Sequence, residues 1–381
     1  MPVVWKVRVK NESGVLVAEL DDFRRLSVQR RVNAPGMITL AMNGNDSRVQ
    51  LFELDGQVEA WRRDQTVGLQ WYAEHETLFR SLVDETDDRG YRTFTAYCAG
   101  YLDIAAREII AYRAGTSYTR KSGDGSLVMR RYVNQNIGTS ANSTDRFWDG
   151  VQAGLTVGAT PTAGYTWSGQ RSSKNLLETL QEIGDATFCD FDIVGTGANT
   201  YEFQTFPGQR GTDRTITGLD AATGLNGAGN APLIFSQELG NMRRPRYTFA
   251  RQDEVNTVAV LGPGEGLDRI ITVRANVAAV NASNRNRRAI ARDGRQQFTS
   301  DERNALGDGV LQARQARQEL SFEAIQLPGC YYGLHYTLGD KITARYAGVT
   351  FNKRIVGVDI NVEPSSGGLV ETINLVLADV I

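Results

Sequence analysis

Apolar and polar residues alternate along most of the first hundred positions, which is the pattern of half-buried β-strands. The stretch "VWKVRVK" at residues 4–10 is separated from "VLVAEL" by the turn "NESG", and this arrangement predicts a β-hairpin. After a second turn at residues 34–36, Ile38, Leu40 and Met42 share one face of a strand. At least six such strands with no helix between them predict a small antiparallel barrel or sandwich.

The pattern changes at about residue 101, where helical spacing begins. The clearest helix lies within residues 172–184, and its apolar stripe consists of Leu176, Leu177, Leu180 and Ile183. Ser172 or Ser173 is suited to cap its start and Gly184 to close it. Helical spacing also occurs in "YLDIAAREIIAY" and "SLVMRRYVNQNI", and a hairpin pattern follows residue 186. Residues 101–215 therefore predict a mixed α+β module.

Strand patterns resume after a segment rich in Gly, Ala and Asn at residues 216–232. A polar, Arg-rich interruption then precedes a predicted helix near residues 300–318, where Thr299 and Glu302 have the spacing of a capping box. The remaining residues return to strand texture up to "ETINLVLADV". The whole chain is thus predicted to be mainly β, with α+β inserts.

Two distant regions follow the same order of elements. "LDGQVEAWR" is followed by "TLFRSLVDE" and "YRTFTAYCAG", and "LGDKITARY" is followed by "TFNKRIVGVDI" and "VETINLVLAD". Upstream, "RRVNAPGMITLAM" has a counterpart in "ARQDEVNTVAV". A chance echo among short strands is the alternative, but the common order favours a duplicated antiparallel β-barrel. The predicted domains are a first barrel at 1–102, a middle α+β module at 103–215, a second barrel at 216–262 and 319–381, and an insertion at 263–318.

Composition narrows the classes of function. The 381 residues carry a formal net charge of −2, so no overall positive charge marks a nucleic-acid-binding surface. Cys98, Cys189 and Cys330 are too few and too scattered for a disulfide framework, which is typical of a protein made in a reducing compartment. The N-terminus does not have the pattern of a signal peptide, and no apolar run is long enough to cross a bilayer. The sequence predicts a soluble protein without a membrane anchor.

Residues suited to catalysis or metal binding are scarce. Of the two histidines, His75 lies between two glutamates in an alternating strand that turns it away from both, and His335 lies in an aromatic loop. Cys330 and His335 are five residues apart, but no second Cys–His pair completes a zinc site. The glycine-rich strings lack the Lys-Ser/Thr ending of a phosphate loop. We therefore predict no catalytic, cofactor-binding or metal-binding residues, and no cofactor.

Several charged clusters admit two interpretations. Asp190 and Asp192 lie on one face of a predicted strand, about 7 Å apart, a separation that a pair of glycosidase carboxylates can adopt. A solvated strand face explains the same pattern. The acidic run "DETDDRG" at residues 84–90 fits a hairpin tip, and the arginine clusters at 243–246 and 285–292 fit loops or protein interfaces better than phosphate contacts.

The order of motifs over most of the chain resembles the tail-tip hub (baseplate hub) proteins of long-tailed bacteriophages. The motifs are "LSVQRRVNAPGMITLAM", "LDGQVEAWRR", "LFRSLVDETDDRGYRTFTAYCAGY" and "AAREIIAY" near the N-terminus, and "QELSFEAIQLPGCYYGLHYTLGDKITARYAGV", "RIVGVDINVE" and "ETINLVLAD" near the C-terminus. The resemblance implies two tube-like β-barrels per chain joined by α+β modules. It also implies a homotrimer whose six similar units match a hexameric tail tube and enclose the DNA exit channel.

The same resemblance implies the location and the partners. The expected location is the tail tip of the virion. The expected partners are the tail tube or distal tail protein ring, the tape-measure protein and a separate spike or fibre protein, with DNA passing through the lumen without specific binding. Related hubs occur in contractile injection systems and gene-transfer particles, and the sequence does not separate these from a phage. No catalytic residue is carried over from the family.

Two other functions stay open at the level of sequence. A cell-wall hydrolase acting at the tail tip would use carboxylates such as Asp190 and Asp192. A host-glycan receptor-binding module would use the aromatic residues of the middle region, which are Tyr112, Tyr118, Trp148 and Trp167.

Overall fold

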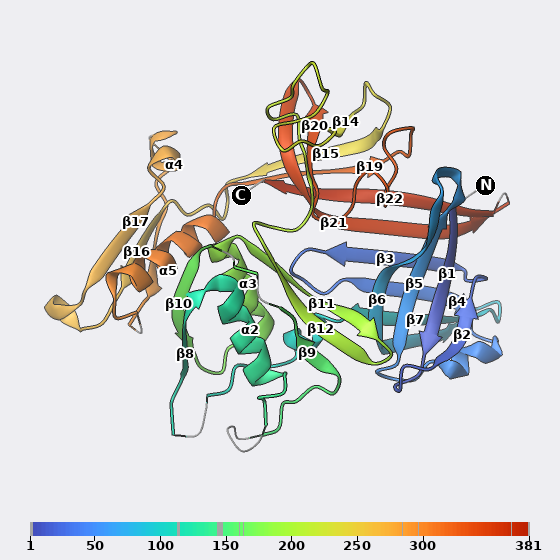
Figure 1. The fold of residues 1–381 in the computed structure, drawn as a ribbon, viewed down its shortest axis with the longest axis horizontal. Helices are drawn as coiled ribbons and strands as arrows, with labels where there is room; N and C mark the ends of the chain where they lie inside the picture. Colours follow the sequence, from blue (N-terminus) through green and yellow to red (C-terminus); the bar gives the residue numbers. More distant parts are fainter. Residues whose placement is uncertain are drawn as a thin grey trace.

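The computed structural model describes residues 3–112, 115–142, 148–159, 161–162, 164–283, 285–295, 297–366 and 368–379. Their fold is mainly β, as predicted, with few helices (Figure 1). The largest element is a 14-stranded sheet whose path runs β15-β19-β22-β21-β3-β4-β7-β6-β5-β1-β2, with β20 paired to β21 and with β13 and β14 paired to β20.

The two halves of the sequence contribute seven strands each to this sheet. The first half supplies β1 (Val3–Lys10), β2 (Leu16–Leu20), β3 (Arg25–Arg31), β4 (Met37–Asn43), β5 (Gln57–Asp64), β6 (Leu69–Thr86) and β7 (Arg92–Gly100). The second half supplies β13 (Asp213–Arg214), β14 (Ile234–Ser236), β15 (Met242–Ala250), β19 (Arg317–Ala324), β20 (Lys341–Tyr346), β21 (Val349–Ser365) and β22 (Gly368–Asp379). Three short 3-10 helices, η1 (Ser47–Leu51), η2 (Gln65–Val67) and η3 (Gly266–Asp268), lie in connections.

The expectation of two closed barrels is not confirmed. Among the described residues the sheet does not close on itself, because its path ends at β2 and at β15. Instead β3 of the first half pairs antiparallel with β21 of the second half, and Figure 1 shows the red strand β21 beside the blue strand β3. The alternation predicted from sequence puts the inner faces of both halves into one shared apolar core.

The internal duplication appears in the strand order. The order β3-β4-β7-β6-β5 in the first half corresponds to β15-β19-β22-β21-β20 in the second half, and every neighbouring pair in both series is antiparallel. The counterpart of β4 is therefore β19. The sequence comparison that matched this region to "NTVAV" was wrong, because Thr257–Leu261 belongs to a different sheet. Short apolar strands resemble one another too closely for the pattern alone to choose between them.

Two backbone hydrogen bonds at a turn and a β-bulge in β6 characterise the first copy. At the turn that enters β5, the N–H of Asp55 donates to the carbonyl of Phe79 at 2.9 Å, and the N–H of Phe79 donates to the carbonyl of Gly56 at 2.8 Å. Directly after Phe79 the pairing of β6 with β7 shifts by one residue, a β-bulge that ends at Ser81. Such a bulge increases the local twist of the strand.

The second copy repeats the turn and the bulge. The N–H of Gly339 donates to the carbonyl of Ile355, and the N–H of Ile355 donates to the carbonyl of Asp340, both at 2.9 Å. Directly after Ile355 the pairing of β21 with β22 shifts, and the bulge ends at Gly357. The Gly/Asp turns that the sequence comparison aligned therefore occupy the same place in the two copies.

A mixed α+β part follows the first copy. Its elements are α1 (Asp103–Ala106), β8 (Thr119–Asp124), α2 (Gly125–Asn136), β9 (Leu155–Val157), β10 (Thr166–Arg171), α3 (Leu176–Thr187), β11 (Cys189–Gly197) and β12 (Thr200–Pro207). The strands form two small sheets, β10-β8 and β11-β12-β9, around a core that includes the predicted leucine stripe of α3. Of the three predicted helices, the first is reduced to the four residues of α1.

The predicted ends of α3 were wrong. Asn175 caps the helix, because its side chain accepts a hydrogen bond from the N–H of Glu178 at 3.1 Å. The helix continues past Gly184 to Thr187, and Phe188 ends it with a left-handed backbone at φ 50°. Gly184 serves packing instead, since a Cβ there would lie 2.8 Å from the carbonyl oxygen of Cys189.

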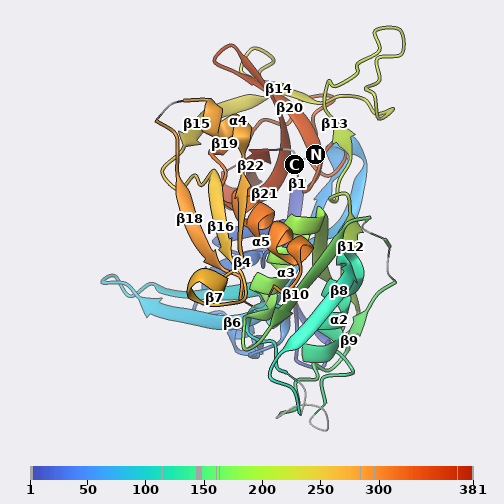
Figure 2. The same ribbon diagram turned by 90° about the vertical axis from the view of Figure 1, so that its left-hand side faces the viewer.

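A further small unit lies between β15 and β19, where the first copy has only the short β3–β4 turn. It consists of β16 (Thr257–Leu261), β17 (Ile271–Ala275), α4 (Val277–Asn281), β18 (Ala289–Asp293) and α5 (Ser300–Ala313). The sheet β17-β16-β18 packs against α5, as Figure 2 shows. The predicted capping box of Thr299 and Glu302 is confirmed. None of the described helices is long and apolar enough to cross a membrane.

Candidate functional site

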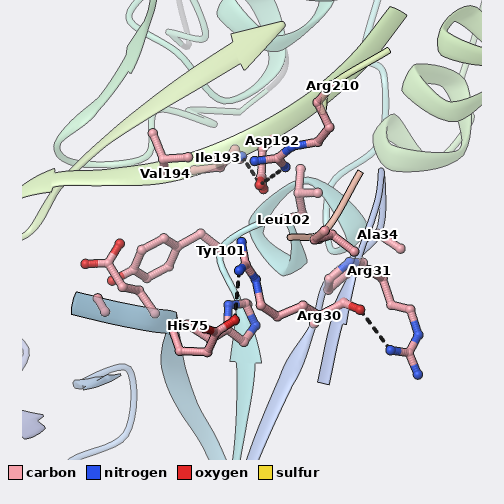
Figure 3. A pocket seen from close by; sticks show the side chains of 17 residues that line it. Arg30, Arg31, Ala34, His75, Tyr101, Leu102, Asp192, Ile193, Val194 and Arg210 are labelled. Carbon is pink, nitrogen blue, oxygen red and sulfur yellow. Dashed lines mark hydrogen bonds and ion pairs between the residues drawn. The ribbon is translucent and has the colours of Figure 1, made fainter. Parts of the chain in front are cut away.

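A polar pocket lies where the two sheet copies and the middle part meet (Figure 3). Its volume is about 130 Å³. Strands β3, β6 and β11 and the loops around them line it, and its main side chains are Arg30, Glu74, His75, Asp192, Arg210 and Leu338. Charged groups from segments that are distant in sequence converge here, so this pocket is a candidate functional site.

Arg30 and Glu74 form the centre of the pocket. The Nη1 atom of Arg30 donates to Oε1 of Glu74 at 2.8 Å, and the hydroxyl of Tyr332 donates to the same oxygen at 2.5 Å. Burial is the largest effect and opposes the charge of Arg30, but Glu74, Tyr332 and Asp192 together hold the pKa of Arg30 above its ordinary value. Burial also raises the pKa of Tyr332 well above its ordinary value. These groups satisfy one another and join β3, β6 and the loop before β20.

His75 lies beside this pair. Burial, with a smaller contribution from the charge of Arg30, lowers the pKa of His75 to about 3. Its Nε2 atom is buried and has no hydrogen-bond partner in the described part of the chain. A Cβ on Gly36 would overlap the imidazole ring, so only glycine fits the β3–β4 turn against it. The ring is neutral near pH 7 and packs against this turn.

The carboxylates considered for hydrolysis are both bound by arginines. Asp190 is 2% exposed and forms an ion pair with Arg354, while its Oδ1 accepts from Nδ2 of Asn33 at 3.0 Å. Asp192 accepts from Nη1 of Arg210 at 2.8 Å. Burial raises the pKa of Asp192, although the charge of Arg210 acts in the opposite direction. Neither carboxylate has the separate environment that distinguishes a general acid from its partner.

The contacts of Asp190 connect three parts of the fold. The aspartate belongs to β11 of the middle part, Asn33 to the β3–β4 turn of the first copy and Arg354 to β21 of the second copy. The backbone N–H of Arg210 adds a further hydrogen bond to Oδ2 at 2.6 Å. Asp190, one member of the pair that suggested catalysis, therefore holds the middle part against both copies, whereas Asp192 binds Arg210 within the middle part.

A second buried ion pair joins the copies directly. Arg62 of β5 is 0% exposed, and its Nε and Nη2 atoms donate to the Glu371 carboxylate of β22 at 2.8 and 2.9 Å. The indole N–H of Trp5 donates to the same carboxylate at 2.8 Å. Burial opposes the charge of Arg62, but Glu371 holds the pKa of the guanidinium above its ordinary value. The sequence analysis did not identify these residues, because no local pattern links positions 309 apart.

The aromatic residues considered for glycan binding have different surroundings. Trp167 is 6% exposed and belongs to the core of the middle part, where it packs edge-on against Tyr132. Tyr118 and Trp148 are exposed, and Tyr112 is half-buried. Trp167 also lines a cavity of about 240 Å³ between the middle part and α5. Its burial against Tyr132 gives it a packing role.

The Cys330–His335 segment forms a turn. The Nδ1 atom of His335 accepts a hydrogen bond from the N–H of Tyr331 at 3.0 Å. Cys330 is buried, and burial raises the pKa of its thiol to about 12. In the described part of the chain, no three His, Cys, Asp or Glu side chains are grouped so that they could hold a metal ion.

Solved structures with the same fold include tail proteins. The 43 kDa tail protein of prophage MuSo2 from Shewanella oneidensis aligns over 99% of this chain and 98% of its own, with a TM-score of 0.58 and 9% identity. A tail protein from Neisseria meningitidis MC58 aligns over 100% and 97%, with a TM-score of 0.55 and 9% identity. Prophage tail protein gp18 from Listeria monocytogenes EGD-e aligns over 98% and 94%, with a TM-score of 0.55 and 8% identity.

The fold is thus one found in phage tail proteins. More particularly, the chain belongs to the family of Siphovirus ReqiPepy6 Gp37-like proteins, whose model matches residues 6–372. No curated protein matches the chain in sequence.

Proposed function

We propose that this protein is a structural, non-enzymatic component of a phage tail, and that three copies form the hub ring of the tail tip. The family to which the chain belongs and the tail proteins with the same fold support the first part. The internal duplication carries the second part. One chain contains the same five-stranded order twice, with the same turn and the same bulge in both copies.

A chain with two similar units can connect a six-fold ring to a three-fold one. A ring of three such chains contains six similar units, although its true symmetry is three-fold. Six units fit a hexameric tail tube or a distal tail protein ring on one side, and three chains fit a three-fold spike or fibre on the other. The centre of the ring would be the DNA exit channel, through which the tape-measure protein and the DNA pass without sequence-specific binding.

The parts of the chain then have separate roles. We assign the tube-like units to residues 1–102 and to residues 216–250 with 319–381. The middle α+β module remains at 103–215, and the insertion is extended to 251–318 because β16 pairs with β17 and β18. Buried ion pairs fix the two units to each other and to the middle module, as a rigid adaptor requires.

Solution mass and electron microscopy of the purified full chain test the proposal. We expect a particle of three times the chain mass of 42.0 kDa, with six similar lobes around a central hole in negative-stain class averages. Mixing with the tube protein of the same phage should leave the three-fold particle intact and cap the tube. A chain that stays monomeric at high concentration and also with the tube protein would refute the hub assignment.

A further inference from the structure

The β21–β3 junction between the two copies within one chain shows how two such copies can pair through their strands. Strand β21 pairs antiparallel with β3 over six residue pairs, from Gly357 opposite Arg31 to Val362 opposite Leu26. The inward side chains of this junction are 0% exposed, namely Val358, Ile360, Val362, Leu26 and Val28. An ion pair between Arg31 and Asp359 at 2.7 Å lies on its outer face. The second copy thus presents its long strand to the first strand of the first copy.

The first copy has the equivalent long strand, but its edge is free. Counted from the bulge, residues 81–86 of β6 correspond to residues 357–362 of β21. These residues pair with β7 on one side, and no described strand pairs with their other side. Leu82 is 48% exposed, whereas its equivalent Val358 is 0% exposed. In Figure 2 the hairpin of β6 and β7 extends away from the rest of the molecule.

The second copy has the equivalent first strand, and it too is free. Strand β15 pairs with β19 alone and ends the path of the sheet. Tyr247 lies opposite Leu320 as Val28 lies opposite Ile38, so Tyr247 is the equivalent of Val28. Tyr247 is 39% exposed and Phe249 is 51% exposed. The chain therefore contains both strands of a second junction, residues 81–86 of β6 and strand β15. These two edges cannot meet within one chain while β21 pairs with β3.

We infer that residues 81–86 of β6 pair antiparallel with β15 of a second copy of this chain, in the register of the β21–β3 junction. The inference rests on the proposed ring and specifies how its chains are joined. Transferring the register puts Leu82 opposite Phe249 of the next copy and Glu85 opposite its Arg246. Pro245, which has no N–H to donate, ends the paired segment.

The charges of the two edges are complementary. The β6–β7 tip carries the acidic run at residues 84–88, and β15 carries arginines at 243, 244 and 246. Asp84 is already paired with Arg92, and Arg243 and Arg244 with Glu323. No ion pair of Glu85 or Arg246 occurs in the described part of the chain, so these two side chains are available to each other. Opposite charges steer and align such surfaces. Exposed apolar side chains on unpaired strand edges otherwise promote aggregation, which gives a physical reason for these edges to be covered.

Disulfide trapping tests the register. Residues directly opposite each other in antiparallel strands have Cβ atoms about 4.5–5.5 Å apart, which approaches the spacing of a disulfide. The double variant Leu82→Cys with Phe249→Cys should therefore form a chain-to-chain disulfide under mild oxidation. The matched control, Val83→Cys with Phe249→Cys, is one residue out of register and points its thiols to opposite faces. The native cysteines are buried and should stay reduced.

Mass measurement on the same samples separates the possible results. A ring that contains the Leu82–Phe249 disulfide, with little disulfide in the control, supports the inference. A ring without that disulfide, or with more of it in the control, overturns the inference and leaves the proposed hub intact. Monomers without any disulfide, both at high concentration and after mixing with the tube protein, overturn both.

A charge exchange gives a second measurement. Glu85→Arg should weaken chain-to-chain association, by up to about fivefold for each contact, because like charges then face each other across the strands. Adding Arg246→Glu should restore association to near its original strength. Failure of the second substitution to restore it would contradict the proposed register.

Discussion

The Arg62–Glu371 pair provides a quantitative test of how the two copies are held together. We consider Glu371→Gln, which keeps the size of the side chain and removes its charge. The Gln amide still offers one oxygen, but its NH₂ group faces the N–H groups of Arg62 and Trp5 that now donate to the carboxylate. The guanidinium, which is 0% exposed, then keeps its charge without its main partner.

The expected magnitude follows from the remaining contacts. Removing one member of a buried ion pair costs about 3–5 kcal/mol, because the other charge stays buried and uncompensated. Asp64 lies 3.6 Å from Arg62 and compensates in part. We therefore expect Glu371→Gln to lower the free energy of unfolding by about 3 kcal/mol, at the lower end of that range. Adding Arg62→Met should recover part of the loss, since no buried positive charge then remains.

Urea unfolding followed by tryptophan fluorescence measures this effect. The matched control is Asp308→Asn, which breaks the exposed ion pair with Arg274 and should change the free energy of unfolding by less than about 1 kcal/mol. If Glu371→Gln cost no more than Asp308→Asn, the buried pair would not be what holds β5 against β22. A loss in the double variant larger than in Glu371→Gln would also refute the reasoning.

Two further predictions concern the polar pocket and its neighbour. The pKa of His75 is lowered to about 3, so the unfolded chain binds its proton below about pH 6.5, and stability should fall by about 2 kcal/mol between pH 6.5 and pH 5. His75→Gln should flatten that dependence in thermal unfolding, and an unchanged slope would contradict it. Asp190→Asn leaves the buried Arg354 guanidinium without its counter-charge and should cost about 3–5 kcal/mol. Asp192→Asn should cost clearly less, because the Asp192 side chain is 26% exposed, and equal losses would argue against this.

Local signals were sufficient to predict many of the strands and part of the duplication. The Gly/Asp pairs at Asp55 and Gly339 precede alternating strands, and turn chemistry and alternation are properties of a few consecutive residues. The leucine stripe of α3 and the capping box of α5 are local in the same sense. These predictions hold because the physical cause of each feature lies within one or two turns of the chain.

The pairing of strands and the buried ion pairs could not be predicted in this way. Alternation indicates which face of β3 is buried, but it carries no information that the neighbouring strand is β21. For the same reason Asp190 was interpreted with Asp192 as a possible catalytic pair, whereas its partner Arg354 is 164 positions away. The side chains of the candidate site carry no local sequence motif, and only the fold shows which residues they contact.

What the two copies share is backbone geometry rather than side chains. Phe79 and Ile355 make the same two hydrogen bonds to their Gly/Asp turns and precede the same bulge, although the residues around them differ. A bulge twists and redirects its strand, so keeping it keeps the direction in which β6 and β21 leave the sheet. That direction brings β21 to β3 within the chain. The same direction in the first copy carries residues 81–86 of β6 outward with β7 as their only described strand partner, which leaves their other edge available to the second copy that we infer.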